Sequence, residues 1–186
     1  MGKQALGFDF GTSNCTISIF DTDKGIVETL PISNYSESKK RSLANQSLFP
    51  SKVGLNDEFE YVFGDDTKNC ERDFVWDNSK RLLEQNTPIY RGGVHKKPIW
   101  VAIGIMAGIF KELKNLSIKT SSPMVITVPA NSYSTQRSLT RLAAESFNFN
   151  VNQLVSEPCA AALGCYEYMD KLKHILIVDV GGGTTD

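Results

Sequence analysis

The sequence predicts a mixed α/β fold in which three antiparallel strands come first and helices connect the strands that follow. Apolar residues alternate along the first thirty residues, and later short β-branched runs alternate with runs whose apolar residues recur at helical spacing. The chain has 186 residues, of which 41% are hydrophobic and 22% charged. These values are typical of one globular domain with a sizeable core.

The three opening strands are expected at residues 6–10, 17–19 and 26–30, because apolar residues alternate there and Asp21, Asp23 and Gly25 favour a tight turn. From residue 33 to about 98 the composition shifts to Ser, Asn, Asp and Lys without clear periodicity. A loop-rich peripheral insertion is the structure that this composition favours.

Order returns with a helix predicted over residues 99–116 and a strand over 124–128, which we expect to be covered on both faces because it is apolar throughout. The next helix begins near Ser134, with an apolar stripe at Leu139, Leu142, Ala143 and Phe147. A strand follows at 153–155, and Pro158 then opens a helix that reaches about Met169. The last predicted strand, 175–178, is fully apolar.

Charge and targeting signals exclude several classes of protein. Twenty basic and 21 acidic residues give a net charge of −1, so the chain lacks the basic field that nonspecific nucleic-acid binding requires. The longest apolar run, 99–110, is too short to cross a membrane, and no signal peptide precedes the first strand. The four cysteines show no metal-ligand spacing, so we expect reduced, mostly buried thiols in a cytoplasmic protein.

Two similar loops follow the first and last predicted strands. The first reads Asp9-Phe10-Gly11-Thr12-Ser13-Asn14, and the second reads Asp179-Val180-Gly181-Gly182-Gly183-Thr184. Each has a carboxylate, one apolar residue, then glycine and a hydroxyl residue. A single copy favours an ordinary tight turn, but two copies at strand ends favour a ligand site.

The residue types of these loops suit a polyphosphate with its metal. Glycine lets successive backbone N–H groups point at an anion, and the hydroxyls of Thr12, Ser13 and Thr184 add donors. The carboxylates of Asp9 and Asp179 are oxygen ligands for Mg²⁺, directly or through water. Neither the P-loop pattern nor the dinucleotide-binding G-x-G-x-x-G pattern occurs in these loops.

The two loops resemble the phosphate motifs of the Hsp70 (DnaK-like) chaperones of the actin-like ATPase superfamily. Further Hsp70-like motifs occur between them in the same order: Phe63-Gly64-Asp65, Ser79-Lys80-Arg81-Leu82, Ile126-Thr127-Val128-Pro129-Ala130 with Gln136-Arg137, and Ser156-Glu157-Pro158 with Ala160-Ala161-Ala162. Ser13, Glu84, Cys159 and Thr185 depart from the family pattern. The chain thus resembles a divergent member, similar to the YegD-like branch.

The resemblance implies a ribonuclease H-like (actin-like ATPase) fold, with a mixed five-stranded sheet, flanking helices and a peripheral insertion subdomain. It implies ATP or ADP with Mg²⁺ as ligands, and K⁺ as a further candidate ion. By the same resemblance Lys80, Glu157 and Asp179 are catalytic, and Pro129 with Arg137 forms an interdomain relay. From the residues alone, Lys80 reads as an exposed lysine, Glu157 as a carboxylate at its own helix N-terminus, and Arg137 as a solvent-facing side chain.

We expect residues 1–38 and 98–178 to form the core of a first ATPase lobe, 39–97 the insertion, and 179–186 the start of a second lobe. The second lobe and a peptide-binding domain are expected to lie outside this chain, with J-domain and nucleotide-exchange co-chaperones as partners. Because nucleotide binding would use both lobes, we expect this chain by itself to bind ATP weakly or not at all and not to hydrolyse it.

Three other functions share parts of this pattern. A sugar or metabolite kinase would use the same fold, with its catalytic Asp outside this chain. A ribonuclease H-type nuclease would use clustered strand-end carboxylates and two metals, but the glycine-hydroxyl loops and the lack of basic surface argue against it. An actin-like filament protein is the third alternative.

Overall fold

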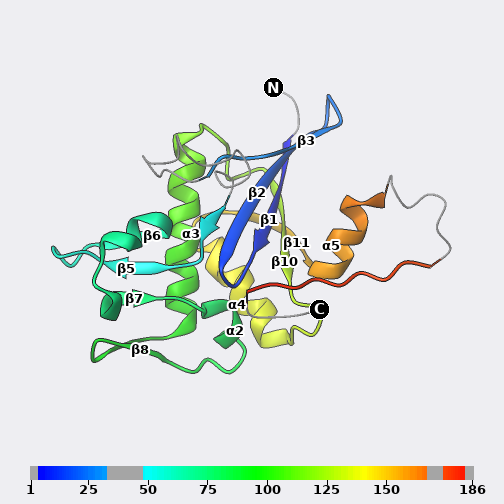
Figure 1. Ribbon diagram of the computed structural model, residues 1–186. Helices are drawn as coiled ribbons and strands as arrows, with labels where there is room; N and C mark the ends of the chain where they lie inside the picture. The colour runs from blue at the N-terminus through cyan, green and yellow to red at the C-terminus, as the bar shows by residue number, and fades with distance from the viewer. Residues whose placement is uncertain (1–3, 33–47, 167–173, 183–186) are drawn as a thin grey trace.

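The computed structural model describes residues 4–32, 48–166 and 174–182 (Figure 1). Its main sheet has the order β11-β10-β1-β2-β3, with parallel pairing between β1, β10 and β11 and antiparallel pairing between β1, β2 and β3. The strands are β1 (Gln4–Phe10), β2 (Asn14–Asp21), β3 (Ile26–Thr29), β10 (Pro123–Val128) and β11 (Asn150–Ser156). The predicted mixed sheet and its opening antiparallel strands are therefore confirmed.

A sixth strand, β4 (Phe49–Pro50), pairs with the start of β2, so the sheet has one strand more than the five expected. Two residues are too few for an alternating pattern, which is why the sequence gives no signal for β4.

One face of this sheet forms the hydrophobic core. On β1, Leu6, Phe8 and Phe10 are buried while Gly7 and Asp9 are exposed. The buried face packs against α3 (Pro98–Asn115) and α4 (Ser134–Glu145), which also contact each other. Strand β10 alternates between buried and partly exposed residues, so its expected coverage on both faces is wrong. The polar side chains of the open face are the ones available for ligand chemistry.

The outer part of the molecule is built from short elements packed beside α3 (Figure 1). A three-stranded sheet has the order β6-β5-β7, and β8 pairs with β9 in a hairpin. The elements are β5 (Val53–Leu55), β6 (Tyr61–Phe63), the 3-10 turns η2 (Gly64–Asn69) and η3 (Arg72–Phe74), β7 (Val75–Trp76), α2 (Ser79–Leu82), β8 (Ile89–Arg91) and β9 (Val94–Lys96). None of these strands exceeds three residues, which explains the weak periodicity of this stretch.

Helix α4 differs from the sequence prediction in the face that it buries. On α4 the buried residues are Gln136, Thr140, Ala143 and Ala144, whereas Leu142 is 52% exposed, so the predicted stripe is rotated. Helix α5 (Glu157–Gly164) begins where predicted, and its predicted end near Met169 lies outside the described residues. No helix in the described part of the chain has the length and apolar character needed to span a membrane.

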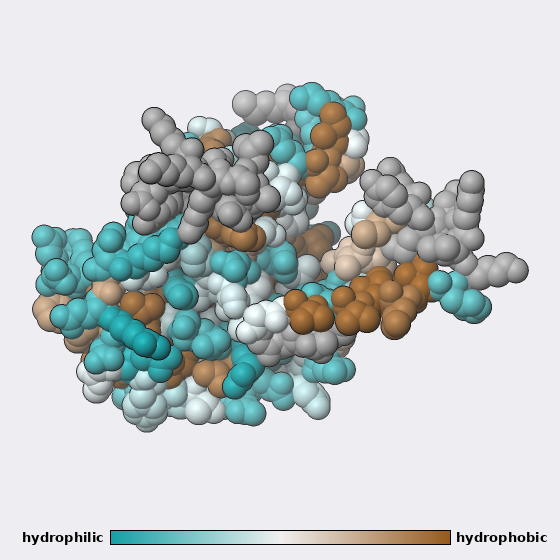
Figure 2. Space-filling model, viewed as in Figure 1, coloured by the Kyte–Doolittle hydropathy of each residue, from teal (hydrophilic) through white to brown (hydrophobic). Residues whose placement is uncertain are grey.

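The predicted last strand at 175–178 is wrong. Residues 174–182 run as an extended segment with no strand, apart from a single bridge at Val180. Leu176, Val178 and Val180 are exposed, and Figure 2 shows them as a hydrophobic stripe across this face of the molecule. The segment has strand-like composition, but the described residues provide no neighbouring strand for it.

Candidate functional site

The carboxylate of Asp9 lies at the carboxyl end of β1, next to the parallel strand β10. Phe8 pairs with Ile126 in the sheet, so Asp9 and Thr127 are neighbours, and Thr127 Oγ1 donates a 2.7 Å hydrogen bond to Asp9 Oδ1. Among the described residues, Asp9 Oδ2 has no partner. The hydroxyl therefore fixes the orientation of the carboxylate and leaves one oxygen for a metal-bound water or an ion.

The loop after β1 is a tight turn that requires glycine at position 11. A Cβ on Gly11 would lie 2.0 Å from the backbone oxygen of Asn14. Ser51 holds the turn from outside, because its Oγ donates to Gly11 O over 2.7 Å and its backbone N donates to Ser13 O over 2.9 Å.

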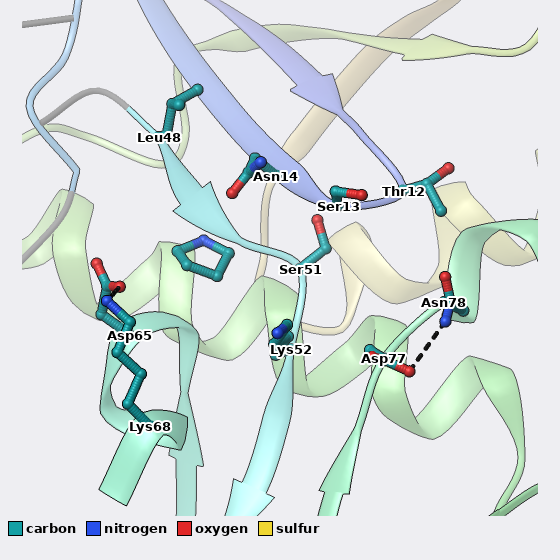
Figure 3. Close-up of a pocket in the computed structure, with 11 residues that line it drawn as sticks. Thr12, Ser13, Asn14, Leu48, Ser51, Lys52, Asp65, Lys68, Asp77 and Asn78 are labelled. Atoms are coloured by element: carbon teal, nitrogen blue, oxygen red, sulfur yellow. Dashed lines mark hydrogen bonds and ion pairs between the residues drawn. The ribbon is translucent and has the colours of Figure 1, made fainter. Parts of the chain in front are cut away.

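The turn opens into a pocket of about 490 Å³ (Figure 3). The predicted residues Thr12, Ser13 and Asn14 all line it. Its other lining residues are Leu48, Pro50, Ser51, Lys52, Asp65, Lys68, Asp77 and Asn78, and Asn78 Nδ2 donates to Asp77 Oδ1 over 3.0 Å. The hydroxyls, the amides and the ammonium group of Lys52 are suited to binding an oxyanion, whereas Lys68 pairs with Asp65 over 2.7 Å.

The second glycine loop contacts the first. A Cβ on Gly182 would lie 2.0 Å from Ser13 Oγ and 2.9 Å from Ser13 Cβ, so the Gly182 backbone and the Ser13 side chain approach as closely as glycine permits. Gly181 is exposed and Asp179 partly buried, while Gly183 and Thr184 lie outside the described residues. The structure thus brings together two loops that are far apart in the sequence.

Within the described residues, no group of three or more His, Cys, Asp or Glu side chains is arranged to hold a metal ion. A fully protein-ligated metal centre therefore does not fit this part of the chain. Mg²⁺ retains several waters and takes one or two carboxylates together with phosphate oxygens, so Asp9 with its free oxygen fits that mode of binding.

Lys80 and Glu157 form a buried ion pair beside the first loop. Lys80 Nζ bonds to Glu157 Oε1, and the two side chains are 4% and 9% exposed. Lys80 Nζ also lies 5.9 Å from the ring centroid of Phe10. The exposed-lysine alternative is thus wrong, whereas Glu157 does lie in the first turn of α5, where a carboxylate also stabilises its helix.

Helix α4 contacts both sides of this ion pair. Gln136 is buried, and its Nε2 donates to the backbone oxygen of Lys80 over 2.9 Å. Arg137 Nη2 donates to Leu154 O over 3.0 Å, on the strand that leads into Glu157. Two consecutive residues of one helix therefore hold the backbone on either side of the pair.

The predicted relay residues Pro129 and Arg137 are connected through one serine. Arg137 Nη1 donates to Ser132 Oγ over 3.3 Å, and Ser132 N donates to the backbone oxygen of buried Pro129 over 3.1 Å. Arg137 is partly buried with hydrogen bonds at both ends of its guanidinium group, so the solvent-facing alternative is wrong.

We expect Gln136→Leu to lower the free energy of unfolding by about 1–3 kcal/mol, because the buried carbonyl of Lys80 loses its donor. Urea denaturation measures this change. Gln85→Leu is the matched control, since Gln85 is exposed and should change stability by less than about 0.5 kcal/mol. Equal effects of the two substitutions would contradict a structural role for the Gln136 bond.

Comparison with known proteins agrees with this geometry. The family model described as MreB/Mbl protein matches residues 75–186, which is more than half of the chain and includes Lys80, Glu157 and the second glycine loop. The chain belongs to the MreB/Mbl family. Together with its full-length similarity to DnaK proteins, described next, this match makes the chain an Hsp70-like domain of the actin-like ATPase type.

The curated relatives are chaperones, and the chain spans less than a third of their length. It is 29% identical to the protein named "Chaperone protein DnaK" of Mycoplasmopsis agalactiae, over 100% of the chain and 30% of the relative. It is 31% identical to the protein of that name from Ureaplasma parvum, over 97% of the chain and 28% of the relative. The shared region therefore includes both glycine loops of this family member and the residues between them.

Cys15 lies beneath the first loop of this actin-like domain, where burial raises the pKa of its thiol to about 12. The hydrogen bond with Ser51 and the charge of Lys80 lower that pKa, while the charge of Asp9 raises it. The expectation of mostly buried cysteines is wrong: Cys15 is the buried one, and Cys70 is partly buried. Cys159 and Cys165 are exposed.

The thiol of Cys15 should make stability fall at high pH. Between its ordinary pKa of 9.0 and its folded value of about 12, the unfolded chain releases this proton while the folded chain retains it. Stability therefore decreases as pH rises through this window, by up to about 1.4 kcal/mol per pH unit. Denaturation from pH 8 to 11 should show this extra slope in the native sequence and lose it in Cys15→Ser. Parallel curves for the two proteins would show that Cys15 ionises normally.

Several residues of the site carry no sequence signal of their own. Ser51 and Lys52 lie in a stretch without periodicity, and Thr127 reads as an ordinary strand residue. Their contacts with the first loop arise from the pairing of β4 with β2 and of β10 with β1. Gln136 occurs in a motif that resembles Hsp70, but its bond to Lys80 follows only from the fold.

Proposed function

We propose that this chain forms the first lobe of an Hsp70-like ATPase that binds MgATP between its two glycine loops. Hydrolysis occurs when a second lobe completes the site, and the nucleotide state then controls a peptide-binding domain. The contact between Gly182 and Ser13 is the observation that carries this proposal, because it joins the two loops with phosphate-binding composition.

Each loop contributes a defined set of donors. Gly11, Thr12, Ser13 and Asn14 offer backbone N–H groups and hydroxyls from one side, and Gly181 and Gly182 offer backbone N–H groups from the other. Gly183 and Thr184, which lie outside the described residues, are further phosphate-binding candidates by their composition. Asp9 and Asp179 bind Mg²⁺, mainly through its waters, and K⁺ is a further candidate beside the phosphates. When bound, Mg²⁺ supplies charge neutralisation for the β- and γ-phosphates.

Lys80 and Glu157 are the catalytic pair of this proposal, with Asp179. The ammonium of Lys80 acts as a point charge toward the γ-phosphate and the attacking water, and Glu157 orients that water. In the structure these two side chains pair with each other, which compensates for burying both charges. An incoming phosphate competes with Glu157 for the same ammonium group.

The relay follows the hydrogen bonds of α4. Pro129, Ser132 and Arg137 lead to Leu154, and β11 then continues into Glu157. Movement of Glu157 on nucleotide binding would be transmitted along this path to other domains.

We assign residues 1–38 and 98–178 to the lobe core, 39–97 to an insertion subdomain, and 179–186 to the start of the second lobe. J-domain and nucleotide-exchange co-chaperones are the corresponding partners.

An actin-like filament protein is the second candidate, because the matched family is described as MreB/Mbl protein. A sugar or metabolite kinase is a third, but it gives the buried Lys80 no role. Both alternatives would share the phosphate loops. A kinase would transfer the phosphate to a sugar or metabolite instead of water, and a filament protein would polymerise.

The test uses the longer protein in which a second lobe follows this chain. We expect this protein to hydrolyse MgATP without any sugar. The Lys80→Ala variant should hydrolyse it at least about 100-fold more slowly while still binding the nucleotide. Lys111→Ala, an exposed lysine on α3, is the control and should leave the rate unchanged. A sugar requirement would indicate a kinase, and nucleotide-dependent sedimentation would indicate a filament. For the 186-residue chain, micromolar MgATP affinity by calorimetry would contradict the need for two lobes.

A further inference from the structure

A second groove, of about 600 Å³, lies in the outer part of the molecule and shares no lining residue with the phosphate pocket. Its walls come from β6, β7, β9 and the first turns of α3, which Figure 1 shows running beside these short strands. Gly104 and Ala107 of α3 line it with small side chains, and Val53 of β5 packs directly against Gly104.

Several aromatic rings line this groove. Trp76 is fully buried at its base, whereas Trp100 is 63% exposed and Tyr61 is 53% exposed. The chain has two tryptophans, and both line this groove. The indole Nε1 of Trp76 has no hydrogen-bond partner among the described residues. Large exposed rings gathered around a groove are typical of binding surfaces for flat apolar groups.

The charged groups lining this groove are all basic. His95, Lys96 and Lys97 line it, and no Asp or Glu does. Lys96 Nζ donates to Tyr61 Oη over 2.8 Å and lies 5.3 Å and 5.6 Å from the ring centroids of Tyr61 and Trp76. Within the described residues, neither Lys96 nor Lys97 pairs with a carboxylate. An ammonium group has three donors, so Lys96 retains donors for an anion.

We propose that this groove binds a small aromatic carboxylate. The ring of the ligand lies against Trp100, Tyr61 and the apolar base, and its carboxylate bonds to Lys96 with support from Lys97 and His95. The aromatic rings alone would accept a neutral ligand, and lysines alone would accept any anion. Their combination in one groove selects a molecule that has both features. This inference does not depend on the proposed ATPase function.

The test is a titration of the ¹⁵N-labelled chain with 2-naphthoate, followed through the two indole N–H signals in NMR spectra. We expect saturable shifts of the Trp100 signal, which Trp100→Phe assigns. The neutral analogue 2-naphthalenemethanol should bind about tenfold more weakly, and Lys96→Met should remove most of this difference.

Two further variants keep the result interpretable. Ala107→Leu adds bulk to the floor of the groove and should abolish binding, while Lys111→Met is the control that should leave affinity unchanged. If Lys96→Met disturbs folding, which the dispersion of the spectrum would reveal, Lys97→Met replaces it. Unsaturable shifts, or equal affinity for the carboxylate and the neutral alcohol, would overturn the proposal.

Discussion

We expect Lys80→Met to lower the free energy of unfolding by about 3–5 kcal/mol, because it removes the cation paired with a buried carboxylate. Glu157 is 9% exposed and cannot regain full hydration in the folded state. In a domain of this size the loss corresponds to a fall in Tm of roughly 6–20 °C, at about 2–4 °C per kcal/mol. Chemical denaturation of the 186-residue chain measures it directly.

A double variant separates the pair from simple loss of packing. Lys80→Met with Glu157→Gln removes both charges, and we expect it to recover more than half of the stability that Lys80→Met loses. Lys111→Met, on the exposed face of α3, should be nearly neutral. If the stability losses of Lys80→Met and Glu157→Gln simply add in the double variant, the two side chains do not interact. That result would contradict the ion pair.

Gly11→Ala has the second largest expected effect. Its Cβ would lie 2.0 Å from the backbone oxygen of Asn14, and backbone cannot move aside as a flexible side chain can. We expect a loss of about 3 kcal/mol, at the upper end of the usual range for overpacking, because the turn must open and the bonds from Ser51 to Gly11 and Ser13 weaken. Denaturation and the amide NMR signals of the loop measure the effect.

Gly7→Ala is the matched control for this substitution. Gly7 lies on β1, the strand that leads into this turn, and a Cβ there meets no atom within 4 Å. We expect Gly7→Ala to be neutral or slightly stabilising, since alanine restricts the unfolded chain more than glycine does. Similar losses for the two variants would mean that the close contact between position 11 and the Asn14 backbone has no special importance for stability.

Local patterns predicted the parts of this fold that depend on local physics. The alternation in β1 and β2 follows from one buried face, and Gly11 follows from the tight turn after β1, where a Cβ would meet the Asn14 backbone. The 18-residue helix α3 begins at Pro98, close to its predicted start, because its apolar spacing is regular and proline suits a first helical turn.

Contacts between distant residues could not be predicted from spacing. Lys80 and Glu157 are 77 residues apart, and only the resemblance to Hsp70 placed both in one site. The buried stripe of α4 includes Gln136 and Thr140, polar residues whose burial depends on their hydrogen-bonding environment and not on hydrophobicity. The segment at 175–178 has the composition of a strand, but strand formation also needs a neighbouring strand, which sequence composition does not supply.

A disulfide between the two glycine loops would show whether they meet in one site, as the contact between Gly182 and Ser13 indicates. Gly182→Cys with Ser13→Cys brings together two Cβ positions 2.9 Å apart, slightly closer than the about 3.5–4.5 Å of a relaxed disulfide. The background carries serine at Cys70, Cys159 and Cys165, since Cys15 is buried.

We expect this pair to oxidise to an intramolecular disulfide within minutes of mild oxidation, as measured by intact mass and loss of thiol labelling. Leu176→Cys with Ser13→Cys is the control, because Leu176 is 88% exposed on the same extended segment and six residues before the contact. Preferential crosslinking of the first pair supports a shared phosphate site. Failure of that pair to crosslink in a folded chain, or equal crosslinking of the control, contradicts it.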